Sequence, residues 1–142
     1  MTAALLTRHA ERVQGLMAAA VRDAVGRPFL ESVDLLVRAL IQAEAVDLRL
    51  SPIVHQLLPT TGDSPIDRFE ADMEGVIAGM LASAPDLRPR DPTHAAAVLV
   101  RATGGVLRTT ARRAPAQLTA PGFADELSAL IRGYLQTMST AP

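Results

Sequence analysis

The sequence predicts an all-α protein, a single bundle of about six helices that spans residues 1–142. Every long apolar pattern repeats with the three-and-four spacing of an amphipathic helix. No stretch shows the alternation, or the enrichment in β-branched and aromatic residues, that is typical of strands. The segments between these patterns are short, as in helical bundles, so one compact domain is expected.

The first helix is expected at about residues 2–24, ending before Gly26-Arg27-Pro28, with Arg8, Arg12 and Arg22 in solvent. Its apolar face consists of Leu6, Ala10, Val13, Met17, Ala20 and Val21. The second helix, at about residues 29–47, has the clearest buried stripe, formed by Val33, Leu36, Val37, Leu40 and Ile41. A brief helix at 51–58 follows, because Ser51 can cap it and Pro52 suits a first turn.

Two further helices begin with the same kind of signal, a capping residue followed by proline. Ser64-Pro65 opens a helix over 65–84, with an apolar face of Phe69, Met73, Val76, Ile77 and Met80. Asp91-Pro92 opens a helix that ends at Arg112 and Arg113, and its apolar face contains Val98, Leu99, Ala102, Val106 and Leu107. Residues 114–122 form a loop rich in proline and alanine. The last amphipathic helix carries Phe123, Leu127, Leu130, Ile131, Tyr134 and Leu135, and residues 139–142 fray.

Composition excludes several classes of protein. Hydrophobic residues make up 49% and charged residues 20% of the 142, an ordinary globular balance, and no apolar run is long enough to span a membrane. The first residues lack a secretory signal, so a cytoplasmic protein is expected. Without cysteine there is no disulfide and no thiolate chemistry. The net charge is −1 and the basic residues are dispersed, so we expect this segment alone to bind DNA poorly.

No pattern indicates an enzyme, a metal site or a cofactor. His9, His55 and His94 lie on separate helices, outside any metal-binding phrase. The serines lack a nucleophile-elbow context, and the Gly104-Gly105 pair is not followed by the Lys-Ser or Lys-Thr of a phosphate loop. We therefore expect neither catalysis nor a cofactor.

Three stretches, taken in order, carry a family resemblance. They are LLTRHAERV at 5–13, DLRLSPIVHQLLP at 47–59, and VLVRATGGVLR at 98–108 together with Pro115, Leu118 and residues 123–135. In this order they resemble the long first helix, the short middle helix and the dimerisation helices of the carboxyl-terminal domain of TetR-family transcriptional regulators. The resemblance covers essentially the whole chain.

The resemblance implies a homodimer in which the last two helices of each subunit form a four-helix bundle. The preceding helices would enclose a pocket for a small apolar effector of unknown identity, whose binding controls DNA occupancy allosterically. DNA would be contacted only through an N-terminal helix-turn-helix domain, which this chain lacks. The alternative is a stand-alone helical homodimer that binds a small hydrophobic molecule or a protein partner, without DNA binding or catalysis.

For the dimer interface we expect close approach of helices at the small residues Gly104 and Gly105, with Ala95 and Ala97; the other interpretation of these glycines is a tolerated kink. The face of the last helix fits either an interface or internal core. The candidate interface residues are Ala102, Gly105, Arg108, Thr109, Leu127, Leu130, Ile131 and Tyr134.

For the effector pocket the apolar stripes supply most candidates, although ordinary core is the commoner fate of such stripes. His55 lies on the short helix near the expected pocket mouth, and a surface position is its alternative. Arg101 is either a polar anchor or the partner of an acid such as Glu74. The candidate ligand-binding residues are Leu36, Leu40, His55, Leu58, Phe69, Met73, Ile77, Met80, Leu99 and Thr103. With only three Phe and one Tyr, an aliphatic ligand fits better than one held by stacked rings.

Overall fold

The fold comes from a computed structural model that describes residues 2–24, 26–46 and 65–139. These residues form α1 (Thr2–Ala24), α2 (Phe29–Val46), α4 (Pro65–Ser83), α5 (Pro92–Arg113), the 3-10 helix η1 (Pro115–Thr119) and α6 (Phe123–Met138). The predicted all-α class is confirmed, and the predicted bounds of α1, α2, α4 and α5 hold to within one residue. The short helix expected at 51–58, the Ser64 cap and the side chains of Leu6 and Ala10 lie outside the described residues.

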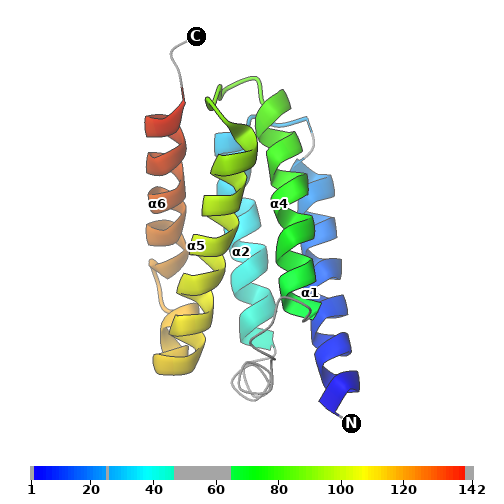
Figure 1. Cartoon of the computed structure of the whole chain (residues 1–142). Coiled ribbons are helices and arrows are strands. Elements are labelled where there is room, and N and C mark those ends of the chain that lie inside the picture. Colours follow the sequence, from blue (N-terminus) through cyan, green and yellow to red (C-terminus); the bar gives the residue numbers. More distant parts are fainter. Residues whose placement is uncertain (1, 25, 47–64, 140–142) are drawn as a thin grey trace.

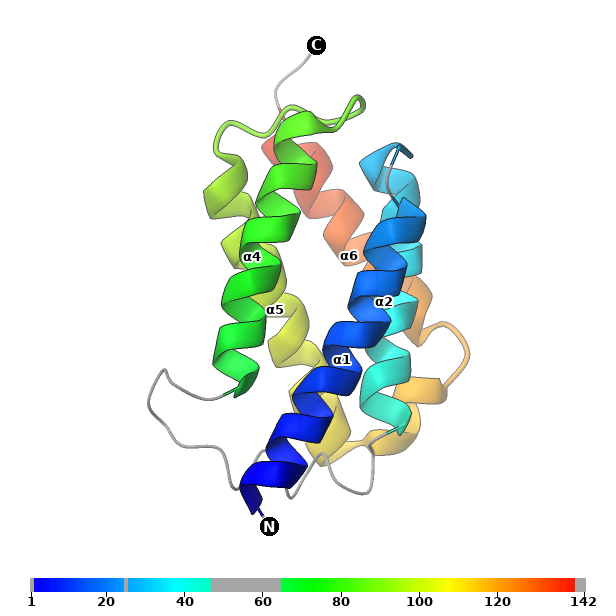
Figure 2. The same ribbon diagram turned by 90° about the vertical axis from the view of Figure 1, so that its right-hand side faces the viewer.

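The helices run roughly along one axis, and α2 lies behind α4 and α5 in the view of Figure 1. The most extensive contacts join α4 to α5, α1 to α2, and α2 to α6. When the molecule is turned by 90° about the vertical axis, α1 and α4 lie on the near side and α6 lies on the far side (Figure 2). The core between them is aliphatic, and its most deeply buried large side chains are Val33, Val37, Leu81 and Leu135, each 2% exposed or less.

The segment expected to be a loop after α5 contains a turn of 3-10 helix instead. Pro115 opens this turn, and Leu118, 2% exposed, holds it against the core. Gly122 then precedes α6 with a φ of 88°, a left-handed conformation that favours glycine. The chain therefore reverses direction between α5 and α6 in a compact, packed connection.

The start of α2 is capped from a distant part of the chain. The backbone N–H groups of Phe29 and Leu30 donate to the two carboxylate oxygens of Asp86, at 2.8 and 2.9 Å. The first N–H groups of a helix have no partner within the helix, and the Asp86 carboxylate satisfies two of them. Its negative charge also interacts favourably with the positive end of the helix dipole. Asp86 thus fixes the loop after α4 to the beginning of α2.

Polar contacts also join α6 to α2. The hydroxyl of Ser128, fully buried, donates to Asp34 at 3.1 Å, and Arg38 donates to both Asp34 and Asp125 at 3.0 Å. Arg132 donates to the carbonyl oxygen of Leu30 at 3.1 Å. The hydrogen bond from Arg38 holds the pKa of Asp34 below its ordinary value against the opposing effect of burial, and the Ser128 hydroxyl lowers it further. One face of α6 is therefore committed to α2.

Candidate functional site

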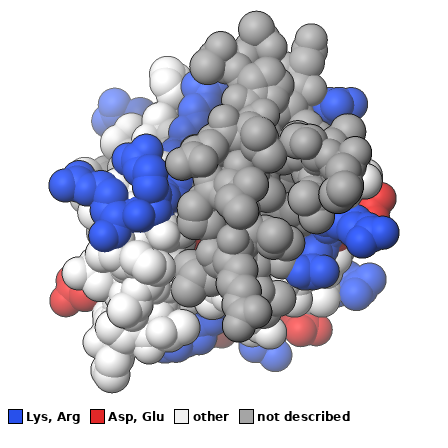
Figure 3. All heavy atoms as spheres, turned by 90° about the horizontal axis from the view of Figure 1, so that it is seen from below, with Lys and Arg blue, Asp and Glu red and all other residues white. Residues whose placement is uncertain are grey.

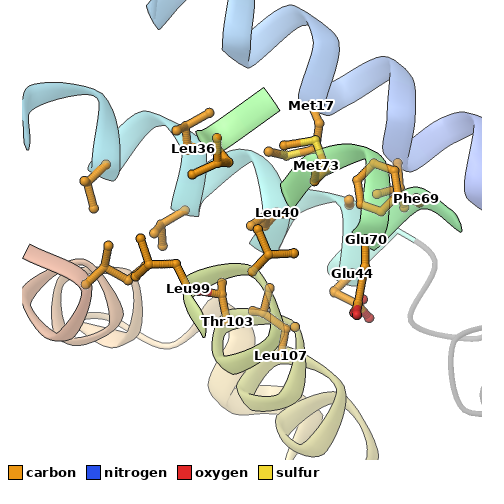
Figure 4. A pocket seen from close by; sticks show the side chains of 18 of the residues that line it. Met17, Leu36, Leu40, Glu44, Phe69, Glu70, Met73, Leu99, Thr103 and Leu107 are labelled. Carbon is orange, nitrogen blue, oxygen red and sulfur yellow. The ribbon is translucent and has the colours of Figure 1, made fainter. Parts of the chain in front are cut away.

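A cavity of about 120 Å³ lies among the α-helices that the structure describes, and each of them contributes to its wall. Val13 and Met17 reach it from α1 and Ile131 from α6, while α2, α4 and α5 supply most of its wall. Most of the lining is aliphatic, with the sulfur of Met73 and the ring of Phe69 on the α4 side (Figure 4). For scale, an engineered cavity of about 150 Å³ stays dry and binds benzene. The space suits a body of about one ring or a short alkyl chain.

Most of the residues predicted to bind the ligand meet at this cavity. Those that line it are Leu36, Leu40, Phe69, Met73, Ile77, Leu99 and Thr103. Met80 is only partly buried and packs on the core without lining the cavity. His55 and Leu58 lie outside the described residues. The helical stripes of α2, α4 and α5 therefore converge on one space.

One end of the cavity is polar. Glu44 at the end of α2, Glu70 near the start of α4, and Arg108 in the second half of α5 all line it. These parts of the three helices meet at the lower end of the molecule in both ribbon views (Figures 1 and 2), and Figure 4 shows the Glu44 and Glu70 carboxylates away from Leu36. The Arg108 guanidinium donates to Glu70, which joins α5 to α4 at this end.

Gly104 makes room for this ion pair. A Cβ atom at Gly104 would lie 2.7 Å from Oε1 of Glu70 and 2.9 Å from a guanidinium nitrogen of Arg108, closer than real Cβ atoms come. The glycine therefore lets the pair lie against the backbone of α5. Close approach of helices between subunits was expected at Gly104 and stays a prediction; within the chain, a Cβ at Gly104 would face the Glu70–Arg108 pair.

The positions of Glu44 and Glu70 in the cavity wall were not predicted from the sequence, and Arg108 was expected at the dimer interface. The sequence does show that Glu70 and Arg108 carry opposite charges and lie beside apolar stripes on two helices. It does not show how the two helices are aligned, and that alignment brings the two side chains together. The alternative partner named for Arg101 is confirmed, because its Nε lies 2.7 Å from Oε1 of Glu74. Arg101 is exposed and does not line the cavity.

A comparison with known families decides the identity of this bundle. The family model described as "Tetracyclin repressor-like, C-terminal domain" matches residues 28–135, from the start of α2 into α6. The chain belongs to this family. No curated protein and no solved structure matches the chain.

The outer surface of this TetR-like domain carries apolar and small residues on α5 and α6. Val98 and Leu130 are 41% and 61% exposed. A Cβ at Gly105 or Gly133 would meet nothing within 4 Å in this chain. We call the following residues, which share one side of each helix, the outer stripe: Val98, Ala102, Gly105 and Thr109 of α5, and Leu130 and Gly133 of α6. Of the predicted interface residues, Ala102, Gly105, Thr109 and Leu130 belong to this stripe.

Three other residues predicted for the interface face the interior of their own chain. Leu127 is 4% exposed within the core, and Arg108 and Ile131 line the cavity. The expectation that they form a surface for a partner is corrected, since the sides of α5 and α6 that carry them face α4 and α2. Tyr134 is half-buried at the edge of the outer stripe, where it lines a second concavity of about 320 Å³ with His94 and Met138.

Three further findings concern charge, membrane-spanning helices and metal ligands. Seen from below, arginine side chains lie along both margins of the molecule with acidic side chains beside them (Figure 3). Within the part of the chain that the structure describes, no helix is long and apolar enough to cross a membrane. The same residues contain no group of three potential metal ligands.

Proposed function

We propose that this TetR-like domain binds a small, mainly apolar effector in the cavity, forms a homodimer through the outer stripe, and controls the DNA binding of a helix-turn-helix domain joined ahead of α1. The observation that carries the proposal is the apolar cavity, which is lined by every α-helix among the described residues. A ligand there touches both α1 and the helices behind the outer stripe. Its different affinity for two arrangements of these helices would set how much of the regulator occupies DNA.

Support for an effector comes from the position of α1. Met17 is 2% exposed and, with Val13, forms part of the cavity wall. A ligand that enlarges or fills the cavity therefore presses directly on α1. Since α1 is the first helix of the domain, its displacement is the simplest route to a preceding DNA-binding domain.

Effector binding is tested by filling the cavity. Leu99 lines the space and is 8% exposed, so Leu99→Phe adds volume where a ligand would lie. With benzyl alcohol as the probe, followed by protein NMR, we expect saturable binding to the wild type and at least a tenfold loss for Leu99→Phe. The matched control is Leu130→Phe on the outer stripe, which should bind the probe as the wild type does. Equal binding by all three proteins would contradict an effector site in this cavity.

Dimerisation and DNA control have separate tests. Native mass spectrometry should show a species of twice 15.0 kDa. An exclusively monomeric chain would contradict the dimer. For DNA control, the coding DNA ahead of Met1 is read in frame for about fifty codons, the length of a compact helix-turn-helix domain. Three short helices with a basic recognition helix are expected, and an in-frame stop codon would leave a dimer without direct DNA control.

A further inference from the structure

Thr103 places a hydroxyl group in the apolar cavity. The residue is 7% exposed and lines the space between Leu99 and Leu107. Among the described residues its hydroxyl has no hydrogen-bond partner, whereas the hydroxyl of Thr110 on the same helix donates to the carbonyl oxygen of Val106 at 2.7 Å. A ligand that donates to or accepts from this hydroxyl would gain a hydrogen bond on binding.

The Glu70–Arg108 ion pair supplies charge at the polar end of the cavity. The two partners differ in exposure, since the side chain of Glu70 is 18% exposed and that of Arg108 is 33% exposed. Gly104 lets the Glu70 carboxylate lie against the backbone of α5. The carboxylate is therefore the more enclosed partner, while the long arginine side chain has solvent within reach if it is displaced.

The different exposure of the two partners favours a cationic ligand. Glu70 and Arg108 are paired with each other at this end, and the carboxylate is the more enclosed of the two groups. A ligand carboxylate would have to take Arg108 from Glu70 and leave a buried carboxylate without its counter-ion, which is costly. A ligand ammonium group replaces Arg108 at Glu70 and keeps that carboxylate paired.

We propose that the effector is a small amine with an apolar body of about one ring, whose ammonium group pairs with Glu70 and hydrogen-bonds to Thr103 while Arg108 moves toward solvent. This inference rests on the proposed effector cavity and adds the chemical class of the ligand. The ion pair that joins α4 to α5 is then opened by the ligand itself. Effector binding would loosen the contact between these two helices at the polar end.

Three probes of one size test the charge preference: benzylamine, benzyl alcohol and benzoate, titrated near pH 7 and followed by protein NMR. Benzylamine, protonated at this pH, should bind about tenfold more tightly than benzyl alcohol, and benzoate should bind least. Glu70→Gln should remove the preference for the amine and leave the affinity for benzyl alcohol within about twofold. Thr103→Val should weaken both benzylamine and benzyl alcohol severalfold.

Glu74→Gln is the matched control, the same substitution one turn further along α4. Glu74 pairs with Arg101 and does not line the cavity, so the preference for benzylamine should persist. Three results would overturn the inference. Benzoate could bind most tightly of the three probes, the preference for benzylamine could survive Glu70→Gln, or Glu74→Gln could remove that preference as fully as Glu70→Gln does. Binding in the cavity without charge preference overturns only this inference. If none of the probes binds in a manner sensitive to Leu99→Phe, the proposed effector site itself is wrong.

Discussion

The two sides of α5 differ in what they contact. The inner side carries Leu99, Thr103 and Leu107, all buried, and it lines the cavity together with α2 and α4. The opposite side carries the α5 part of the outer stripe, where Val98 is 41% exposed and a Cβ on Gly105 would touch nothing. Contacts among the described residues cover the inner side and leave the outer side exposed. Helical periodicity separates the two sides, but only packing shows which one belongs to the chain's own core.

The largest expected effect comes from truncating the inner side. Leu107 is 2% exposed, so Leu107→Ala should lower the free energy of unfolding by about 2–5 kcal/mol at any protein concentration. Leu130→Ala on the outer stripe should cost less, and its cost should vary with protein concentration because it acts through the dimer. Urea denaturation at two protein concentrations measures both variants. If both variants lost the same free energy of unfolding at both protein concentrations, the two sides of α5 and α6 would not differ in what they contact.

The outer side is tested by adding bulk to it. Gly105→Leu should raise the dissociation constant of the dimer at least tenfold, about 1.4 kcal/mol, because the side chain occupies the space where a partner helix approaches. Gly79→Leu on α4 is the control, since Gly79 is also exposed and helical and has nothing within 4 Å of its Cβ position. Light scattering over a dilution series reports both. A dimer that Gly105→Leu leaves unchanged would place the interface elsewhere.

A smaller effect is expected from the long-range cap of α2. Asp86→Ala removes the acceptor for the N–H groups of Phe29 and Leu30 and should cost about 1 kcal/mol of stability, the usual value for a lost cap. Asp72→Ala on the exposed side of α4 is the control and should change stability by less than about 0.5 kcal/mol. Urea denaturation separates them. Equal losses would mean that the cap adds nothing to the stability of α2.

The smallest effect is a pH dependence at the contact between α2 and α6. Arg38 and Ser128 lower the pKa of Asp34 in the folded chain, so its contribution to stability is present above the ordinary carboxyl pKa, about 4, and is lost as the pH falls through the lowered value. The difference in free energy of unfolding between wild type and Asp34→Asn should therefore shrink as the pH falls below about 4. Because Asp34 is 37% exposed, solvent screening keeps the effect small. A difference that grows as the pH falls would reverse the assignment.

Local signals in the sequence predict the helices well. Asp91-Pro92 marks the start of α5, and the Asp91 carboxylate does accept from the N–H of His94 at 3.1 Å. The apolar stripes of α2, α4 and α5 also identify most of the cavity wall, since residues that share a stripe face the same space. Both successes depend on interactions within a few residues of sequence.

Contacts between distant residues could not be predicted in the same way. Asp86 caps a helix that begins 57 residues earlier, and nothing near Asp86 marks it as a cap. The Glu70–Arg108 pair depends on how α4 and α5 lie against each other, and the periodicity of neither helix contains that register. Arg108, Leu127 and Ile131 were expected at the dimer interface for the same reason, because the periodicity of a helix does not indicate which neighbouring helix each side contacts.

The most direct test of the two-sided account is a filtered NOE experiment on a mixture of isotope-labelled and unlabelled subunits with unlabelled benzyl alcohol. We expect NOEs from the ligand to the methyl groups of Leu99 and Leu107, and NOEs from the partner subunit to those of Val98 and Leu130. Ligand NOEs to Val98 or Leu130, or partner NOEs to Leu99 or Leu107, would contradict the division of α5 into an effector side and a dimer side.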